Sequence, residues 1–112
     1  MTRPSPYRAV ADATRRRILD LLREEGPQRA GDIAARFPTV SRPAVSRHLR
    51  VLRRSGFVEE AKDGRERWYQ FNPAPFRRMY QEWLRHYEAF WSERLAALKR
   101  VAEDDDRRRF KS

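Results

Sequence analysis

Cysteine is absent from the 112 residues. Its absence excludes disulfide bonds, thiolate metal sites and redox sensing through thiols. No stretch approaches the roughly 18 consecutive apolar residues that a membrane-spanning helix requires, and residues 1–16 lack the apolar core of a secretory signal peptide. We therefore expect a cytoplasmic protein that has no membrane segment.

Acidic residues are scarce relative to basic ones, with 16 Asp and Glu against 26 Lys and Arg and a formal net charge of +10. Such an excess favours a polyanionic partner, either nucleic acid or an anionic membrane surface. Lysine occurs only at positions 62, 99 and 111, so nearly all the basic residues are arginine. Arginine suits phosphate recognition, but a G+C-rich coding sequence gives the same bias, and we give the bias more weight.

Residues that would support catalysis are also missing. The chain has no glycine-rich phosphate loop, its two histidines lie far apart in the sequence, and no carboxylates are paired in an apolar setting. We expect neither an enzyme nor a cofactor.

The length suits one small domain. Residues 1–6 contain two prolines and are expected to form a flexible tail. Residues 7–102 form the predicted domain, and residues 103–112 a charged tail that is frayed.

Helix signals fill the first half of that domain. Residues 7–11 are expected to form a short helix, and a second follows, with Asp12 or Thr14 as its N-cap and Gly26 as its end. Residues 28–37 predict a third helix, which Pro38 ends.

A fourth helix follows a three-residue turn at residues 38–40. Ser41 is a good N-cap for it, and Pro43 lies in its first turn, where a missing N–H costs nothing. Gly56 closes this helix as a C-cap.

The pattern then changes from helix to strand. Residues 57–71 predict a two-stranded hairpin that turns at Asp63-Gly64. This turn would pair Lys62 with Arg65, Glu60 with Arg67, and Val58 with Tyr69. A long helix is expected to begin around Pro75.

The helix of residues 41–54 has an ordinary apolar stripe of Val45, Leu49 and Leu52 and a basic outer face. Between residues 33 and 58 there are six arginines and no carboxylate. A helix that enters a DNA groove must avoid acids, because DNA carries about one negative charge per ~1.7 Å of its axis. Three helices followed by a hairpin is the order of a winged helix-turn-helix, a mainly α fold with a small β wing.

The candidate DNA-binding residues divide by position. Arg42, Ser46 and Arg47 lie on the first two turns, where base edges are within reach. Three arginines further along the helix are assigned to phosphates, namely Arg50, Arg53 and Arg54. Arg65 and Arg67 belong to the wing. The alternative for all of them is a solvated basic face, and for Arg67 a cross-strand pair with Glu60.

Four segments resemble the ArsR/SmtB family of bacterial winged-helix transcriptional regulators: ADATRRRILDLLREEG, GDIAARF, SRPAVSRHLRVLRRSGFV and DGRERWYQFNP. The resemblance covers roughly residues 7–100. It implies a homodimer joined through the first and last helices, bound to an imperfect inverted repeat and acting mostly as a repressor. It also implies DNA contacts, at Arg42, Pro43, Ser46, Arg47, His48 and Arg65. His48 otherwise serves in packing or bonds a phosphate.

The metal sites of the family are not matched. Residues 29–34 lack the paired cysteines of one site type, and Arg29 replaces a small polar helix cap. For the second type the last helix offers only His86, with Glu82 and Glu93 nearby, which is not a complete ligand set. We expect no metal and an exposed His86, as in a metal-independent branch that the segment YEAFWSERLAAL resembles.

Aromatic residues are concentrated in the last helix. As an exposed patch they would be a liability, whereas in a dimer seam they would be buried. The expected dimer interface consists of Tyr80, Trp83, Tyr87, Phe90, Trp91, Leu95 and Leu98. The alternative is a small-molecule pocket lined by Trp83, Tyr87 and Trp91, but no residue identifies an effector.

The sequence thus predicts a sequence-specific regulator that binds double-stranded DNA as a homodimer and represses transcription. The alternatives are a winged-helix protein-interaction module and a non-specific DNA-binding protein. RNA binding would favour aromatics exposed on a sheet, and a membrane-surface helix would need a broader apolar face than residues 41–54 have.

Overall fold

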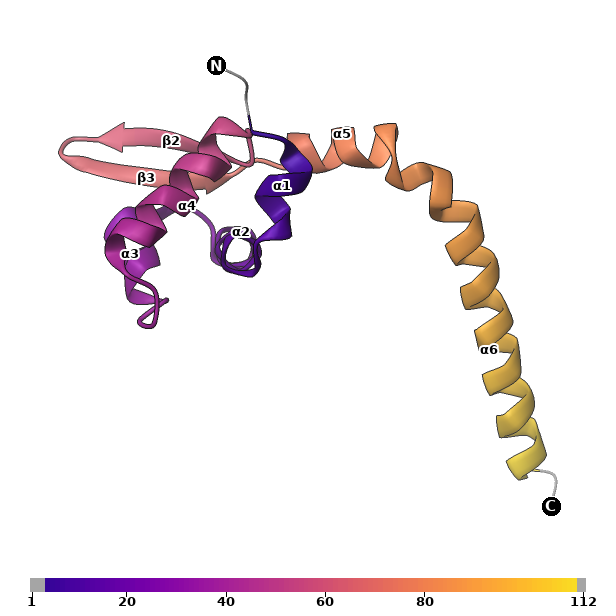
Figure 1. The fold of residues 1–112 in the computed structure, drawn as a ribbon. Coiled ribbons are helices and arrows are strands. Elements are labelled where there is room, and N and C mark those ends of the chain that lie inside the picture. The colour runs from indigo at the N-terminus through magenta and orange to yellow at the C-terminus, as the bar shows by residue number, and fades with distance from the viewer. Residues whose placement is uncertain (1–3, 111–112) are drawn as a thin grey trace. The chain divides into compact units, whose positions relative to one another are not determined.

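The computed structural model describes the backbone of residues 4–110 and the side chains of residues 4–105. Its helices and strands are labelled in Figure 1. The chain divides into two units between Met79 and Tyr80. The first unit contains α1 (Pro6–Ala11), α2 (Ala13–Glu25), β1 (Gln28–Arg29), α3 (Ala30–Ala35), α4 (Arg42–Arg54), β2 (Val58–Asp63) and β3 (Glu66–Phe71). Helix α5 (Ala74–Glu82) spans the boundary, and a 3₁₀ helix η1 (Leu84–Tyr87) and α6 (Glu88–Phe110) follow.

The second helix begins and ends as predicted, whereas the first begins at Pro6, inside the segment expected as a tail, and two arginines join the two helices. Asp12 caps α2, and Gly26 ends it with a φ of +81°. The guanidinium of Arg15 donates to the carbonyls of Ala9 at 2.7 Å and Arg8 at 3.0 Å. Arg16 donates in the same way to the carbonyls of residues 10 and 11. These bonds satisfy the last carbonyls of α1, which have no partner inside their own helix.

The helix predicted for residues 28–37 is wrong at its start. Gln28 and Arg29 form β1, which pairs antiparallel with β3 through Gln28–Tyr69 and Arg29–Trp68. Helix α3 therefore begins only at Ala30. A third strand completes the sheet in the order β1-β3-β2, with β3 in the centre. Residues 28 and 29 thus pair with a strand that is distant in the sequence, instead of forming the first turn of the helix that their local pattern predicts.

Helix α4 is capped at both ends by the expected residues. The Oγ of Ser41 accepts a hydrogen bond from the N–H of Ala44 at 3.2 Å. At the other end Gly56 adopts a φ of +84°, and the N–H of Phe57 reaches the carbonyl of Leu52 at 2.9 Å. This is a Schellman motif, which turns the chain into the core at Phe57. The connection from α3 is longer than the predicted three-residue turn, because α3 already ends at Ala35.

The hairpin is confirmed, but the predicted register is wrong by two residues. Val58 pairs with Phe71, and Asp63 pairs with Glu66, so the turn consists of Gly64 and Arg65. Gly64 has a φ of +65°, and no described residue other than glycine has a positive φ. A turn whose first central residue alone has positive φ is of type II′, whereas a type I′ turn at Asp63-Gly64 would also force Asp63 to positive φ. A shift of two residues leaves every side chain on its predicted face.

The expected pairs from the hairpin are accordingly replaced. Lys62 lies opposite Arg67 rather than Arg65, and Glu60 lies opposite Tyr69. An ion pair between Glu60 and Arg67 nevertheless forms on the diagonal, at 3.4 Å.

The hydrophobic core lies within the first unit. It takes side chains from α1, α2, α3, α4, the hairpin and the start of α5. The buried apolar residues are Ala9, Ile18, Leu19, Leu21, Leu22, Ile33, Val45, Leu49, Leu52, Phe57, Val58, Tyr69 and Met79. The predicted stripe of α4 is part of this core. Figure 1 shows α4 lying alongside the β2–β3 hairpin, and both elements contribute buried side chains to the core.

The single long helix predicted from Pro75 is interrupted. Helix α5 ends at Glu82, and Trp83 has a φ of −139° and a ψ of −59°, outside helical geometry. The hydroxyl of Tyr80 hydrogen-bonds the carboxylate of Glu88, although eight residues of continuous helix would separate them by about 12 Å along the axis. The interruption contains neither proline nor glycine. Helix α6 then continues through residues 103–110, part of the segment expected as a charged tail.

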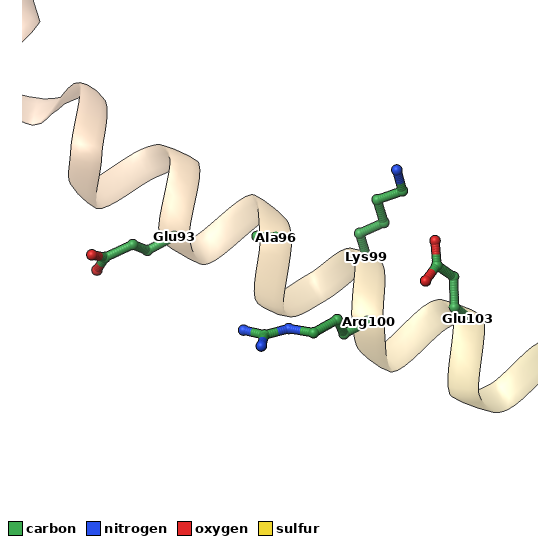
Figure 2. A pocket seen from close by; sticks show the side chains of 5 residues that line it. All are labelled: Glu93, Ala96, Lys99, Arg100 and Glu103. Atoms are coloured by element: carbon green, nitrogen blue, oxygen red, sulfur yellow. The ribbon is translucent and has the colours of Figure 1, made fainter.

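The part of the second unit whose side chains are described, residues 80–105, has no core of its own. Every side chain described from Tyr80 to Asp105 is exposed. A hollow of about 430 Å³ lies along α6. Figure 2 shows its five lining side chains, which all come from this one helix. Because no second element walls it, the hollow is a polar strip of the helix surface. At about 100° per residue, the centre of this strip lies on the other side of the helix from Trp91 and Leu98.

Candidate nucleic-acid interface

The exposed face of α4 is basic. Its buried side carries Val45, Leu49 and Leu52. At about 100° per residue the opposite side carries Pro43, Arg47, Arg50 and Arg54, and all four are exposed. Arg42 and Ser46 are also exposed, on the first two turns. An α-helix of this kind matches the major groove of B-DNA, which is about 12 Å wide.

Most of the predicted DNA-binding arginines are free of ion pairs within the part of the chain whose side chains are described. Within residues 4–105, carboxylates pair with Arg23, Arg29, Arg36, Arg53 and Arg67. In the same part of the chain no ion pair involves Arg42, Arg47, Arg50, Arg54 or Arg65. All five belong to α4 or to the hairpin turn, although arginines on other helices, such as Arg17 and Arg77, also have no ion pair within these residues. These five cations are thus available to an external anion.

One carboxylate joins α4 to the hairpin. The side chain of Glu60 on β2 is 12% exposed, and its Oε2 accepts a hydrogen bond of 2.6 Å from Nη1 of Arg53. Its Oε1 lies 3.4 Å from Nε of Arg67. Sequence reasoning anticipated a pair between Glu60 and Arg67 but missed Arg53, which lies on another element.

A hollow of about 270 Å³ lies between α4 and the hairpin. Its lining consists of Ala30, Ser46, Leu49, Arg50, Arg53, Glu60, Arg67 and Tyr69. Four predicted site residues are thus brought together here, two of them as partners of Glu60. Arg65 belongs to the turn of the hairpin and is exposed.

His48 occupies the boundary between the basic face and the core. Its ring is half-buried, and Nδ1 lies 3.3 Å from Nη1 of Arg15. A guanidinium only donates, so Nδ1 is the acceptor in this contact. Arg15 therefore connects α1, α2 and α4, a role that its place in a run of three arginines did not reveal.

Arg29 ties the wing to the start of α3. Its guanidinium lies 2.9 Å from Asp32 and 2.8 Å from Glu66, and it lies over the ring of Trp68 at 5.6 Å. The hydrogen bonds to Asp32 and Glu66 raise the pKa of Arg29. The side chain makes no capping bond to α3. It joins the hairpin to the start of α3 through its contacts with Glu66 and Asp32.

The residues expected in a dimer interface are all exposed. The exposed fraction rises along the chain, from 43% at Tyr80 to 66% at Leu98. Trp83 and Tyr87 pack edge-to-face at 5.8 Å, and Phe90 packs against Trp91 at 5.6 Å. Leu95, the remaining member of the set, is exposed as well. The hydrogen bond to Glu88 raises the pKa of the Tyr80 hydroxyl.

Metal-binding and membrane-spanning features are both missing from the described residues. No group of three or more His, Cys, Asp or Glu side chains in this part of the chain could hold a metal ion. His86, the candidate ligand of the last helix, is exposed on η1. Within the same residues, no helix is both long and apolar enough to cross a membrane.

Comparison with known proteins places these features in one family. Residues 10–61 match the family described as "Helix-turn-helix domain". The chain is 35% identical over 102 residues to the HTH-type transcriptional regulator Rv2034 of Mycobacterium tuberculosis, a match that covers 89% of this chain and 90% of that protein. It is 39% identical over 66 residues to the transcriptional repressor SdpR of Bacillus subtilis, covering 59% of this chain and 71% of the repressor.

Solved structures agree with the curated relatives. An ArsR-like transcriptional regulator from Rhodococcus sp. RHA1 superposes with a TM-score of 0.65 at 39% identity, covering 88% of this chain and 90% of the other. A possible transcriptional regulator for arsenical resistance gives the same TM-score at 37% identity, covering 84% and 95%. These relatives are regulators rather than enzymes. The chain therefore belongs to the ArsR family of winged helix-turn-helix proteins and is a DNA-binding transcriptional regulator.

Proposed function

We propose that the protein is a repressor that binds an inverted-repeat operator as a homodimer and needs no metal ion to do so. One observation carries the DNA-binding part of this proposal: an exposed, acid-free face of α4 presents arginines that no carboxylate within residues 4–105 neutralises. Repression follows if the bound dimer covers promoter DNA. Two relatives bear the word repressor in their names, SdpR and the arsenical resistance operon repressor of Staphylococcus aureus.

The base contacts are assigned to the first two turns of α4. Arg42 and Arg47 can each donate two hydrogen bonds to a guanine, and the hydroxyl of Ser46 can bond to any base. Pro43 lies beside them without a donor. All four side chains are exposed, so none of them must break an internal contact to reach a base edge.

Phosphate contacts are assigned to residues that would lie farther from the base edges of the DNA groove. Arg50 and Arg54 lie on later turns of α4, and Arg65 lies at the tip of the wing. His48 can donate from Nε2, because Arg15 occupies its Nδ1. Arg53 and Arg67 belong to the same surface as the partners of Glu60.

The homodimer is proposed because the described side chains of the second unit, residues 80–105, are all exposed and form no core. Helix α6 and η1 expose large apolar side chains in series, including Trp91 at 60% and Leu98 at 66%. Burial of an aromatic or leucine side chain contributes about 1.5–3 kcal/mol. A second copy of the same helix can bury this series by symmetry, which is the commonest arrangement in oligomers.

Two-fold symmetry of the protein implies symmetry of the DNA site. Two copies of α4 would enter successive major grooves about 34 Å apart. The operator would then be an inverted repeat with half-sites about one helical turn from centre to centre. The branch without metal dependence is proposed because neither metal site type of the family finds its ligands in this sequence.

The test is a fluorescence-anisotropy titration with two duplexes over a salt series. One duplex comes from the region upstream of the protein's own gene, and the other is its shuffled counterpart. We expect preferential binding of the first at about 10⁻⁸ M or tighter, with a steep loss of affinity as salt rises. The chelator EDTA should leave the result unchanged.

Two results would contradict the proposal. Equal and salt-sensitive binding of every duplex, including those from neighbouring promoters, would favour a non-specific DNA-binding protein. Absence of binding at low salt would favour a winged-helix module whose partner is another protein.

A further inference from the structure

We propose that Glu60 sets the specificity of DNA binding by holding Arg53 and Arg67 away from phosphates. Glu60 thus determines the ratio of operator affinity to random-DNA affinity without touching DNA itself. This inference rests on the proposed function, because it assumes that α4 and the wing face the duplex.

The position of Glu60 requires cationic partners. On β2 the side chains of Val58 and Glu60 point to the same face, since successive residues of a strand alternate. Val58 is 2% exposed and belongs to the core, and the Glu60 side chain just beyond it is 12% exposed. A carboxylate withdrawn from water in this way is costly unless it is paired and hydrogen-bonded.

The two partners come from the two elements of the DNA surface. Arg53 approaches Oε2 from α4 at 2.6 Å, and Arg67 approaches Oε1 from β3 at 3.4 Å. Arg67 is a diagonal neighbour of Glu60 across the strands, because Glu60 lies opposite Tyr69. Glu60 thereby joins α4 to the hairpin, because each of its two carboxylate oxygens contacts an arginine from a different element.

The arginines remain half-exposed while they are held. The side chain of Arg53 is 49% exposed and that of Arg67 is 59% exposed. Both line the hollow between α4 and the hairpin, next to Ser46 and Arg50. They are therefore close enough to the DNA surface to bind phosphate once the carboxylate is removed.

The consequence for DNA binding follows from counterion release. Each arginine that neutralises a phosphate makes the slope of log K against log salt more negative by about 0.9. Phosphate contacts carry no sequence information, so releasing two arginines strengthens binding to every duplex alike. With Glu60 in place, a larger share of the binding free energy comes from base contacts.

The experiment compares Glu60→Gln with the wild-type protein on a random duplex over a salt series. We expect a slope that is more negative by about one to two, and random-DNA affinity that is higher by about fivefold at low salt. On a duplex that carries the operator, we expect the ratio of operator to random affinity to fall.

Glu59→Gln is the matched control. It makes the same change in net charge on the adjacent residue, but Glu59 is exposed and bonded to Asn72 at 3.2 Å rather than to an arginine. We expect its slope to stay close to that of the wild type. Equal slope changes in both variants would overturn the inference, since net charge alone would then explain them. Weaker random-DNA binding by Glu60→Gln would overturn it as well.

A second variant keeps the inference testable if Glu60→Gln fails to fold. In Arg53→Gln/Arg67→Gln, we expect the random-DNA slope to change by less than about one, because both arginines are already neutralised. A loss of about two would show that they bind phosphate in the wild type. The slopes are measured on random DNA, so they test Glu60 even if no operator preference is found and the proposed function fails.

Discussion

The carboxylate of Asp12 accepts a hydrogen bond of 3.0 Å from the backbone N–H of Arg15, and this contact begins α2. The bond lowers the pKa of Asp12 below its ordinary value of 3.8. A carboxyl whose pKa is lower in the folded state stabilises the fold above its unfolded pKa, and this contribution is lost as pH falls through the folded pKa.

Asp12→Asn therefore has a pH-dependent effect. Asparagine is as good an N-cap as aspartate, so at pH 7 the variant should lose only the attraction between a negative charge and the helix N-terminus, about 0.3–1 kcal/mol. At a low pH, below the lowered pKa of Asp12 in the folded protein, the difference from the wild type should disappear, because the carboxyl is then protonated. Urea unfolding at both pH values measures this, and a difference that stays constant would contradict the assignment.

Arg47→Ala tests the base-contact assignment. The exposed guanidinium of Arg47 has no ion pair within residues 4–105, so its removal should leave the fold unchanged. Operator affinity should fall by about 1–3 kcal/mol, and sequence preference should relax. The matched control is Arg23→Ala on α2, whose arginine lies 3.0 Å from Glu24. Equal weakening on operator and shuffled DNA would indicate that Arg47 contacts only phosphate.

Trp91→Ala tests the proposed dimer seam. Loss of this ring removes a large part of the apolar series on α6, and the dimer should dissociate at least about tenfold more readily, which corresponds to 1.4 kcal/mol. Sedimentation velocity over a concentration series measures the shift toward monomer. Glu93→Ala, on the polar strip of Figure 2, is the control and should leave the sedimentation coefficient unchanged. An unchanged mass in Trp91→Ala would remove this residue from the seam.

Two glycines should respond oppositely to alanine. Gly56 has a φ of +84°, and a Cβ there would meet Cγ of Pro75 at 3.4 Å, so Gly56→Ala should destabilise by about 1–2 kcal/mol. Gly31 lies in α3 with nothing within 4 Å of an added Cβ, and Gly31→Ala should stabilise by about 0.4–1 kcal/mol. Thermal unfolding of both variants tests the pair. A stabilising Gly56→Ala would refute the left-handed turn at the end of α4.

The sequence could predict those features that depend on residues close together in the chain. Ser41, Asp12 and Gly56 act on atoms within five residues of themselves, and the apolar spacing of α4 determines which side of that helix is buried. The basic face follows directly, because residues opposite Val45 and Leu49 must be exposed.

The features that could not be predicted depend on distant partners or on competing turns. Strand β1 exists because residues 28 and 29 meet β3, about 40 residues later in the chain. The predicted register was wrong by two residues because either Asp63-Gly64 or Gly64-Arg65 can form a two-residue turn. The two turns differ in the backbone strain that they impose on Asp63. Arg53 was assigned to phosphate because nothing on α4 indicates that Glu60 of β2 lies 2.6 Å away.

The division of the chain at Met79 has a consequence for how it melts. Residues before this point share one core, so they should unfold in a single transition at a temperature independent of protein concentration. The side chains described after it, up to residue 105, are all exposed, and a helix without tertiary packing is marginally stable in water. If a second copy supplies that packing, these residues melt in a separate transition whose midpoint rises with concentration. Differential scanning calorimetry would then record two peaks, and only one of them would move on dilution.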